Sequence, residues 1–313
     1  MPRKLTPRSR LLGAHMPAAG GVANALIRGD EIGCTAIQLF TSSPQQRGRP
    51  LREDDIRRYH EARELTGIGF VVAHDSYLIN LASPDTDRLA HSRSEMRGEV
   101  GRAEELGIPW VITHMGAHTG SGEAEGLCVL AASIAGVLRE TSGMRAGIAL
   151  EVTAGQGTSL GHRFEHIAYV LHVVGADERL AVCFDTCHAF AAGYDLRDED
   201  SYNVTIGQLD AVIGLDRLRI IHANDAKRPL GSRVDRHEHI GRGHIGLEAF
   251  RRLVTDQRLL HVPIILETPE SETMHRVNLR RLRGLTRSRR RGNPCPRASM
   301  VRDGNGAEQA VNT

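Results

Sequence analysis

Six apolar segments of this chain end in a side chain that can bind a metal ion. The segments VVAHD, VITHMG, IALEV, VCFDTCH, RIIHAND and IILET supply His74, His114, Glu151, Asp185, His188, His222 and Glu267. The segments are rich in Val, Ile and Leu and do not alternate apolar with polar residues. This pattern is typical of strands buried on both faces of a parallel sheet. The sequence therefore predicts parallel strands that carry ligands at their carboxyl ends.

Two further strand-like segments precede these six, and helix-compatible segments follow the strands. The two are LLGAH at 11–15 and AIQLF at 36–40. The clearest helix is predicted over 86–107, where Gly107 would end it. Eight strand–helix pairs without a repeated motif predict an α/β fold of the closed (βα)8 type, a TIM barrel. Because such strands open their carboxyl ends at one mouth, the ligands should converge there.

The composition agrees with one globular domain followed by a tail. The chain has 313 residues, 40% of them hydrophobic, and residues 1–285 are predicted to form the barrel. Residues 286–313 are basic and lose hydrophobic periodicity, so we expect them to be disordered. There is no membrane-length apolar stretch or signal-peptide core, and the five irregularly placed cysteines are typical of reduced thiols. We expect a cytoplasmic monomer.

The candidate ligands form a nitrogen-rich set. Asp235 and His237 stand two apart in a polar loop and could hold one ion from the same side. With them the set has five imidazoles and four carboxylates, which suits zinc, with manganese or iron as alternatives, better than magnesium. Nine ligands exceed what one ion takes, and about three divalent ions would leave the mouth near a charge of +2. Such a pocket should attract a phosphate, with water activated by metal as the nucleophile.

Two glycine stretches and two cysteines have simpler interpretations. The stretch 241–246 matches G-x-G-x-x-G but follows a polar loop rather than a strand, so no nucleotide cofactor is expected. The stretch 155–161 lacks the Lys-Ser/Thr of a phosphate loop and is expected to let the backbone approach a substrate. Cys183 and Cys187, on either side of Asp185, are interpreted as buried core thiols rather than ligands.

Several long segments resemble the signature segments of one enzyme family. They are HDSYLINLASP at 74–84, VCFDTCHAFAAGYDLR at 182–197, HANDAKRPLGSRVDRH at 222–237, GAHMPAAGGVANA at 13–25 and EVTAGQGTSLG at 151–161. From about Gly13 to Leu285 the chain resembles the endonuclease IV family of apurinic/apyrimidinic (AP) endonucleases, or AP endonuclease family 2. The resemblance implies a xylose-isomerase-like TIM barrel with three zinc ions, one of them replaceable by manganese. It implies DNA repair at the nucleoid, by hydrolysis of the phosphodiester 5′ to an abasic site in duplex DNA. The products would be a 3′-hydroxyl and a 5′-deoxyribose phosphate.

The same resemblance assigns the nine ligands to three ions. It places the first ion on His74, His114 and Glu151, the second on Glu151, Asp185, His222 and Glu267, and the third on His188, Asp235 and His237. Glu151 would bridge the first two ions. With Asp185 and Glu267 it would form the catalytic carboxylates, because the bridged pair would activate the attacking water. The third ion would orient the phosphate and stabilise the leaving oxygen.

The family also inserts side chains into the DNA at the lesion. Tyr77 and Leu78 resemble its wedge pair, and Arg236 is expected among the DNA contacts. Gln45 stands where the family has an Arg, and Arg47 stands where it has an aromatic residue. Because a neutral amide supports the gap less than an Arg does, we expect weaker discrimination of abasic from intact DNA with the chemistry retained.

Two other functions stay open at this point. A sugar isomerase or epimerase uses a similar metal-dependent barrel, but its sites are richer in carboxylates and would not require the loop at 235–237. A non-catalytic protein that binds abasic sites would explain the altered wedge, but it would not need a complete ligand set. The basic tail is expected either to strengthen binding to all duplexes alike through phosphate contacts or to have no effect.

Overall fold

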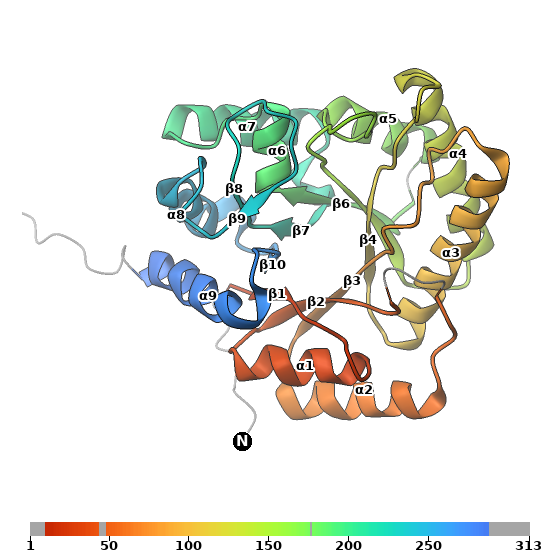
Figure 1. The fold of residues 1–313 in the computed structure, drawn as a ribbon, viewed down its shortest axis with the longest axis horizontal. Helices are drawn as coiled ribbons and strands as arrows, with labels where there is room; N and C mark the ends of the chain where they lie inside the picture. Colours follow the sequence, from red (N-terminus) through yellow and green to blue (C-terminus); the bar gives the residue numbers. More distant parts are fainter. Residues whose placement is uncertain (1–9, 44–47, 176, 288–313) are drawn as a thin grey trace, which may run out of the picture.

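Eight parallel strands form a closed barrel in this computed structural model, which describes residues 10–43, 48–175 and 177–287 (Figure 1). Around the barrel the strands follow the order β1-β10-β7-β6-β5-β4-β3-β2. They are β1 (Leu12–His15), β2 (Ala36–Phe40), β3 (Phe70–His74), β4 (Trp110–His114), β5 (Gly147–Glu151), β6 (Leu180–Asp185), β7 (Leu218–His222) and β10 (Ile264–Leu266). The predicted (βα)8 barrel is confirmed.

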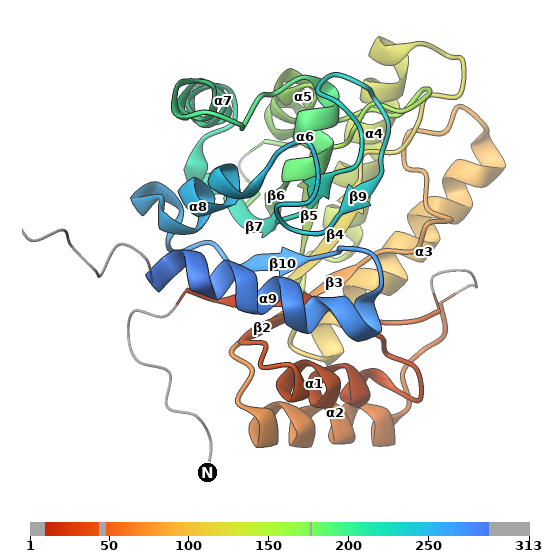
Figure 2. The same ribbon diagram turned by 60° about the vertical axis from the view of Figure 1, so that its left-hand side comes forward.

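Helices surround the barrel on its outer side, with α1 and α2 packed side by side (Figures 1 and 2). The helices are α1 (Val22–Glu31), α2 (Glu53–Thr66), α3 (Thr86–Glu105), α4 (Glu123–Glu140), α5 (Phe164–Val174), α6 (Thr186–Ala192), α7 (Glu199–Val212), α8 (Leu247–Thr255) and α9 (Ser271–Arg287). The helix predicted over 86–107 is α3. Asp85 caps its start, because the carboxylate accepts from two amides of the first turn. Gly107 closes its end in the left-handed conformation, with a φ of 63°.

The apolar strands fill two separate layers of the core. Side chains of one parity form a cluster inside the barrel: Ala36, Val72, Ile112, Ala149, Ala181, Cys183, Ile220 and Ile265. The other parity packs outward against the helices. Both faces of each strand are therefore buried, which explains the absence of alternation in the sequence. Cys183 belongs to the inner cluster, and burial raises the pKa of its thiol to about 12.

Two features next to the barrel differ from what the sequence predicts. His188 lies in the short helix α6, immediately after β6, rather than at a strand end. A two-stranded ribbon of β8 (Asp225–Ala226) and β9 (His237–Glu238) is inserted between β7 and α8.

Helix α9 continues to Arg287. The remaining tail at 288–313 and the loop residues Gln45 and Arg47 lie outside the described residues, so their expected roles stay predictions. In the part of the chain that is described, no helix is both long and apolar enough to cross a membrane.

Candidate metal centre

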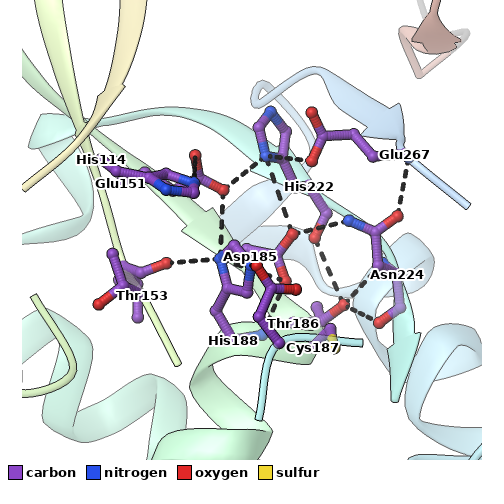
Figure 3. Close-up of polar contacts among 12 residues, drawn as sticks. His114, Glu151, Thr153, Asp185, Thr186, Cys187, His188, His222, Asn224 and Glu267 are labelled. Carbon is purple, nitrogen blue, oxygen red and sulfur yellow. Dashed lines mark hydrogen bonds and ion pairs between the residues drawn. The ribbon is translucent and has the colours of Figure 1, made fainter. Parts of the chain in front are cut away.

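All nine candidate ligands lie at the carboxyl-terminal mouth of the barrel, and Figure 3 shows His114, Glu151, Asp185, His188, His222 and Glu267 among them. The last residues of β3, β4, β5, β6 and β7 are His74, His114, Glu151, Asp185 and His222. The other four come from just beyond the barrel strands: Glu267 after β10, His188 in α6, Asp235 in the loop that leads into β9, and His237 as the first residue of β9. Asp185 also caps α6, since its Oδ1 accepts from the amide of His188 at 2.8 Å. This cap places the first turn of α6 against the mouth.

Glu151 lies at the centre of the group and is almost completely buried. Its Oε2 is 3.3 Å from Nε2 of His74 and 3.3 Å from Nε2 of His114. Its Oε1 is 2.8 Å from Nδ1 of His222, which lies 3.1 Å from Oε2 of Glu267. One carboxylate thus faces two sets of imidazoles through different oxygens (Figure 3). This is the arrangement that a bridging ligand requires.

A second cluster gathers on the side of the loop before β9. Nε2 of His188 is 3.2 Å from Oδ2 of Asp235 and 3.4 Å from Nε2 of His237. Nε2 of His237 is 3.5 Å from Oδ1 of Asp235 and 3.7 Å from Oδ2 of Asp185. The loop pair that the sequence singled out therefore meets His188, with the candidate ligand atoms of the three residues 3.2–3.5 Å apart.

Backbone carbonyls determine which ring nitrogens are free to bind a cation. Three Nδ1 atoms lie at 2.9–3.0 Å from backbone carbonyl oxygens: His74 from Asp75, His188 from Val152 and His237 from Glu267. A carbonyl can only accept, so each Nδ1 carries its hydrogen and each neutral ring directs the lone pair of Nε2 into the mouth. Histidines that bind metals show this pattern. The imidazole lone pairs thus face carboxylate oxygens and one another, which is repulsive unless a cation lies between them. The donor set therefore fits divalent metal ions.

The charges of the site agree with this conclusion. Burial would lower the pKa of His74, but hydrogen bonds and charge interactions with Asp75 and Glu151 outweigh burial and raise it well above its ordinary value. Burial would raise the pKa of Asp235, but the hydrogen bond and charge of His188, together with the charges of His237 and His114, outweigh burial and lower it to about 2. The carboxylates therefore stabilise positive charge beside them. Protons on the histidines can supply this charge, and bound cations can replace these protons.

Two adjoining cavities open over the ligands. Their volumes are about 260 Å³ and about 380 Å³. Both are lined by Tyr77, His114, His188 and Asp235. The mouth is therefore accessible from outside, and Tyr77 is part of the wall of both cavities.

The predicted DNA contacts that the structure describes stand at the rim of these cavities. Tyr77 and Leu78, two large side chains next to each other in the sequence, are 69% and 53% exposed. The Tyr77 ring is supported from below by Phe40, with ring centroids 5.5 Å apart. Arg236 is exposed beside the larger cavity, and its guanidinium donates to the carbonyl oxygen of Asp235 at 2.6 Å. An aromatic ring, an aliphatic group and a cation thus frame the mouth.

Two residues that organise the ligands were missed at the sequence level. Asn224 donates from Nδ2 to Oδ2 of Asp185 at 2.7 Å and accepts from the amide of Glu267 at 2.7 Å (Figure 3). Gln38 lies against His222 and Glu267. Both are fully buried amides. The available signal was a polar side chain inside or next to an apolar strand segment, which needs a hydrogen-bond partner there.

The two glycine stretches have structural roles near the site. The stretch 241–246 wraps around the carboxylate of Asp225, which accepts from the amides of Gly241, Gly243 and Ile245 at 2.9–3.0 Å. The amides of this loop are therefore hydrogen-bonded to an internal carboxylate. The stretch 155–161 contributes Gly155 to the wall of the larger cavity, which agrees with close approach of a substrate to the backbone.

A further group of possible ligands lies away from the mouth. Glu123, His162 and His166 come within coordination distance of one another. However, Nδ1 of His166 accepts from the amide of Gly161 at 3.1 Å, so the hydrogen of the neutral ring is on Nε2. That nitrogen faces Oε1 of Glu123 at 3.1 Å and has no lone pair to offer. The group is an ion-pair contact that links Glu123 of α4 to His166 of α5.

Known proteins of similar sequence and structure identify the family. Residues 28–285 match the family described as xylose isomerase-like TIM barrel. A probable endonuclease 4 of Chloroflexus aggregans is 48% identical over 278 residues, which cover 88% of this chain and 97% of the relative. A probable endonuclease 4 of Geobacter sulfurreducens is 45% identical over 291 residues, which cover 91% and 98%. The crystal structure of endonuclease IV from Thermus thermophilus matches with a TM-score of 0.79 and 34% identity over 89% of this chain and 99% of that one. The chain therefore belongs to the endonuclease IV family of xylose isomerase-like TIM barrels.

Proposed function

We propose that this protein is a zinc-dependent DNA-repair endonuclease that hydrolyses the phosphodiester 5′ to an abasic site in duplex DNA. The products would be a 3′-hydroxyl and a 5′-deoxyribose phosphate. The observation that carries the proposal is a complete set of nine imidazole and carboxylate ligands under a rim of exposed Tyr77, Leu78 and Arg236. The relatives named endonuclease 4 support the same activity.

The proposed ligand sets follow the clusters at the mouth. His74, His114 and Glu151 form one set, and Glu151 also belongs to the next, with Asp185, His222 and Glu267. His188, Asp235 and His237 form the remaining set. Ions held there would supply Lewis acidity toward the phosphate and a nucleophile from water.

The protein's own groups would position the DNA around these ions. Arg236 carries a charge that can pair with a backbone phosphate at the rim. Tyr77 and Leu78 are placed to fill the gap left by a missing base and to offset the cost of unstacking. Asn224 keeps Asp185 and the backbone of Glu267 together, so that two carboxylates of the mouth keep a common orientation.

A cleavage assay separates this function from its rivals. Zinc-loaded protein should cut a duplex with one tetrahydrofuran abasic analogue immediately 5′ to the lesion, and a chelator should stop the reaction. An intact duplex of the same sequence is the control and should remain uncut. A protein that binds the lesion without cutting it would be a damage-binding protein. Epimerisation of ketoses without DNA cleavage would indicate a sugar epimerase.

Replacing Tyr77 by Ala should weaken binding to the abasic duplex without changing the zinc content. Loss of one stacked aromatic side chain costs about 1–3 kcal/mol, which corresponds to roughly 5- to 150-fold in affinity. Binding to intact duplex should change much less, because an intact stack leaves no gap for the ring. The measurement is fluorescence anisotropy with both duplexes at the same salt concentration.

Tyr169→Ala provides the matched control for this variant. Tyr169 is also a partly exposed tyrosine, but it lies on α5 rather than among the residues that line the mouth. It should leave both affinities unchanged. Equal weakening on abasic and intact DNA by Tyr77→Ala would show that the ring does not recognise the lesion.

A further inference from the structure

Gln38, from the N-terminal part of the chain, joins two candidate ligands from its C-terminal part. It lies on β2 and is completely buried. Its Oε1 is 2.7 Å from Nε2 of His222. Its Nε2 is 2.5 Å from Oε1 of Glu267 and 2.8 Å from Nδ1 of His15. One amide therefore contacts an imidazole and a carboxylate that both face the same part of the mouth.

The chemistry of Glu267 determines how this amide is oriented. An ionised carboxylate can only accept hydrogen bonds, so the NH2 group of Gln38 must face Glu267. The carbonyl oxygen of Gln38 then faces His222, and Nε2 of His222 must carry the hydrogen that is donated to it. In the neutral ring, the lone pair is consequently on Nδ1, which points toward Glu151 and Glu267.

We infer that Gln38 is a positioning residue that makes His222 a metal ligand through Nδ1 and holds Glu267 beside it. This inference rests on the proposed metal-dependent function. It also separates His222 from His74, His188 and His237, whose Nδ1 atoms donate to backbone carbonyls and which offer Nε2 instead. The Gln38 side chain fixes the tautomer of His222, whereas backbone carbonyls fix the tautomers of the other three rings.

The tautomers of the zinc-loaded wild-type protein test the inference without any substitution. Long-range proton–nitrogen NMR distinguishes rings protonated on Nδ1 from rings protonated on Nε2. We expect His74, His188 and His237 to be protonated on Nδ1, and His222 to be protonated on Nε2. A metal-bound His222 protonated on Nδ1 would overturn the inference.

Gln38→Met then tests the consequence for metal affinity. Methionine has a similar length but removes both hydrogen-bonding arms, so one zinc-binding step should weaken about 10- to 100-fold while the others keep their affinity. The measurement is stepwise zinc titration of the metal-free protein against a chromophoric chelator. The control is Ser133→Ala, which removes another fully buried hydrogen-bonding side chain on α4, remote from the mouth. It should bind every zinc ion like the wild type.

Circular dichroism of the metal-free proteins shows whether Gln38→Met is folded before titration. If it is not folded, the wild-type tautomers alone decide. Affinities within twofold of wild type for every zinc ion in folded Gln38→Met would overturn the inference. Absence of cleavage by a wild-type protein that binds zinc with the expected tautomers would contradict the proposed function only. Normal cleavage with the opposite tautomer of His222 would contradict the role of Gln38 only.

Discussion

Glu151→Gln is expected to lower the zinc content from about three ions per chain to about one and to slow cleavage about a thousandfold or more. The reason is geometric: Oε2 of Glu151 meets His74 and His114, and Oε1 meets His222. An amide keeps the size but loses the charge, so two of the proposed ions lose a shared anionic ligand. Elemental analysis of the purified variant measures the metal content, and single-turnover cleavage of the abasic duplex measures the rate.

Glu123→Gln is the matched control for this variant. Glu123 also faces two histidines, His162 and His166, but it belongs to the link between α4 and α5 rather than to the mouth. We expect it to keep the full zinc content and a cleavage rate within a few fold of wild type. Full zinc content in Glu151→Gln would show that Glu151 does not bridge two ions.

Removal of the metal ions is expected to lower the melting temperature by roughly 10 °C. Glu151 and Asp185 are buried carboxylates that face lone pairs of imidazoles, so cations bind the folded mouth and have no equivalent site in the unfolded chain. Free zinc at about a thousand times its Kd stabilises the folded state by about 4 kcal/mol. For a domain of this size, each kcal/mol corresponds to roughly 2–4 °C. Calorimetry with excess zinc and with excess chelator measures the difference.

The Glu151→Gln variant gives an internal check on this stabilisation. Because it should hold fewer ions, the gap between its melting temperatures with zinc and with chelator should be smaller than in the wild type. A wild-type protein that melts at the same temperature in both conditions would contradict a metal centre at the mouth. An equal gap in the variant would place the stabilising ions elsewhere.

The order of apolar segments was sufficient to predict the barrel and the location of its site. Parallel strands share one polarity, so ligands at the ends of separate segments must meet at one mouth, however far apart they stand in the chain. His74, His114 and Glu151 illustrate this, since each is the last residue of its strand. The position of Asp235 and His237 was less determined, because a loop has no strand register. Their type and spacing predicted them as candidate ligands, but only the folded loop places them next to His188.

Tertiary structure alone decided how the ligands are held. Barrel closure brings Gln38 of β2 against His222 at the end of β7 and Glu267 after β10, although these strands are far apart in the sequence. The tautomer of each imidazole then depends on whichever acceptor lies behind it, a backbone carbonyl for His74 and a glutamine side chain for His222. The sequence by itself determined which residues can bind metal, because that depends on side-chain chemistry and strand polarity. Which nitrogen each histidine offers was decided by the fold, because hydrogen-bond partners are set by contacts between segments that no local pattern encodes.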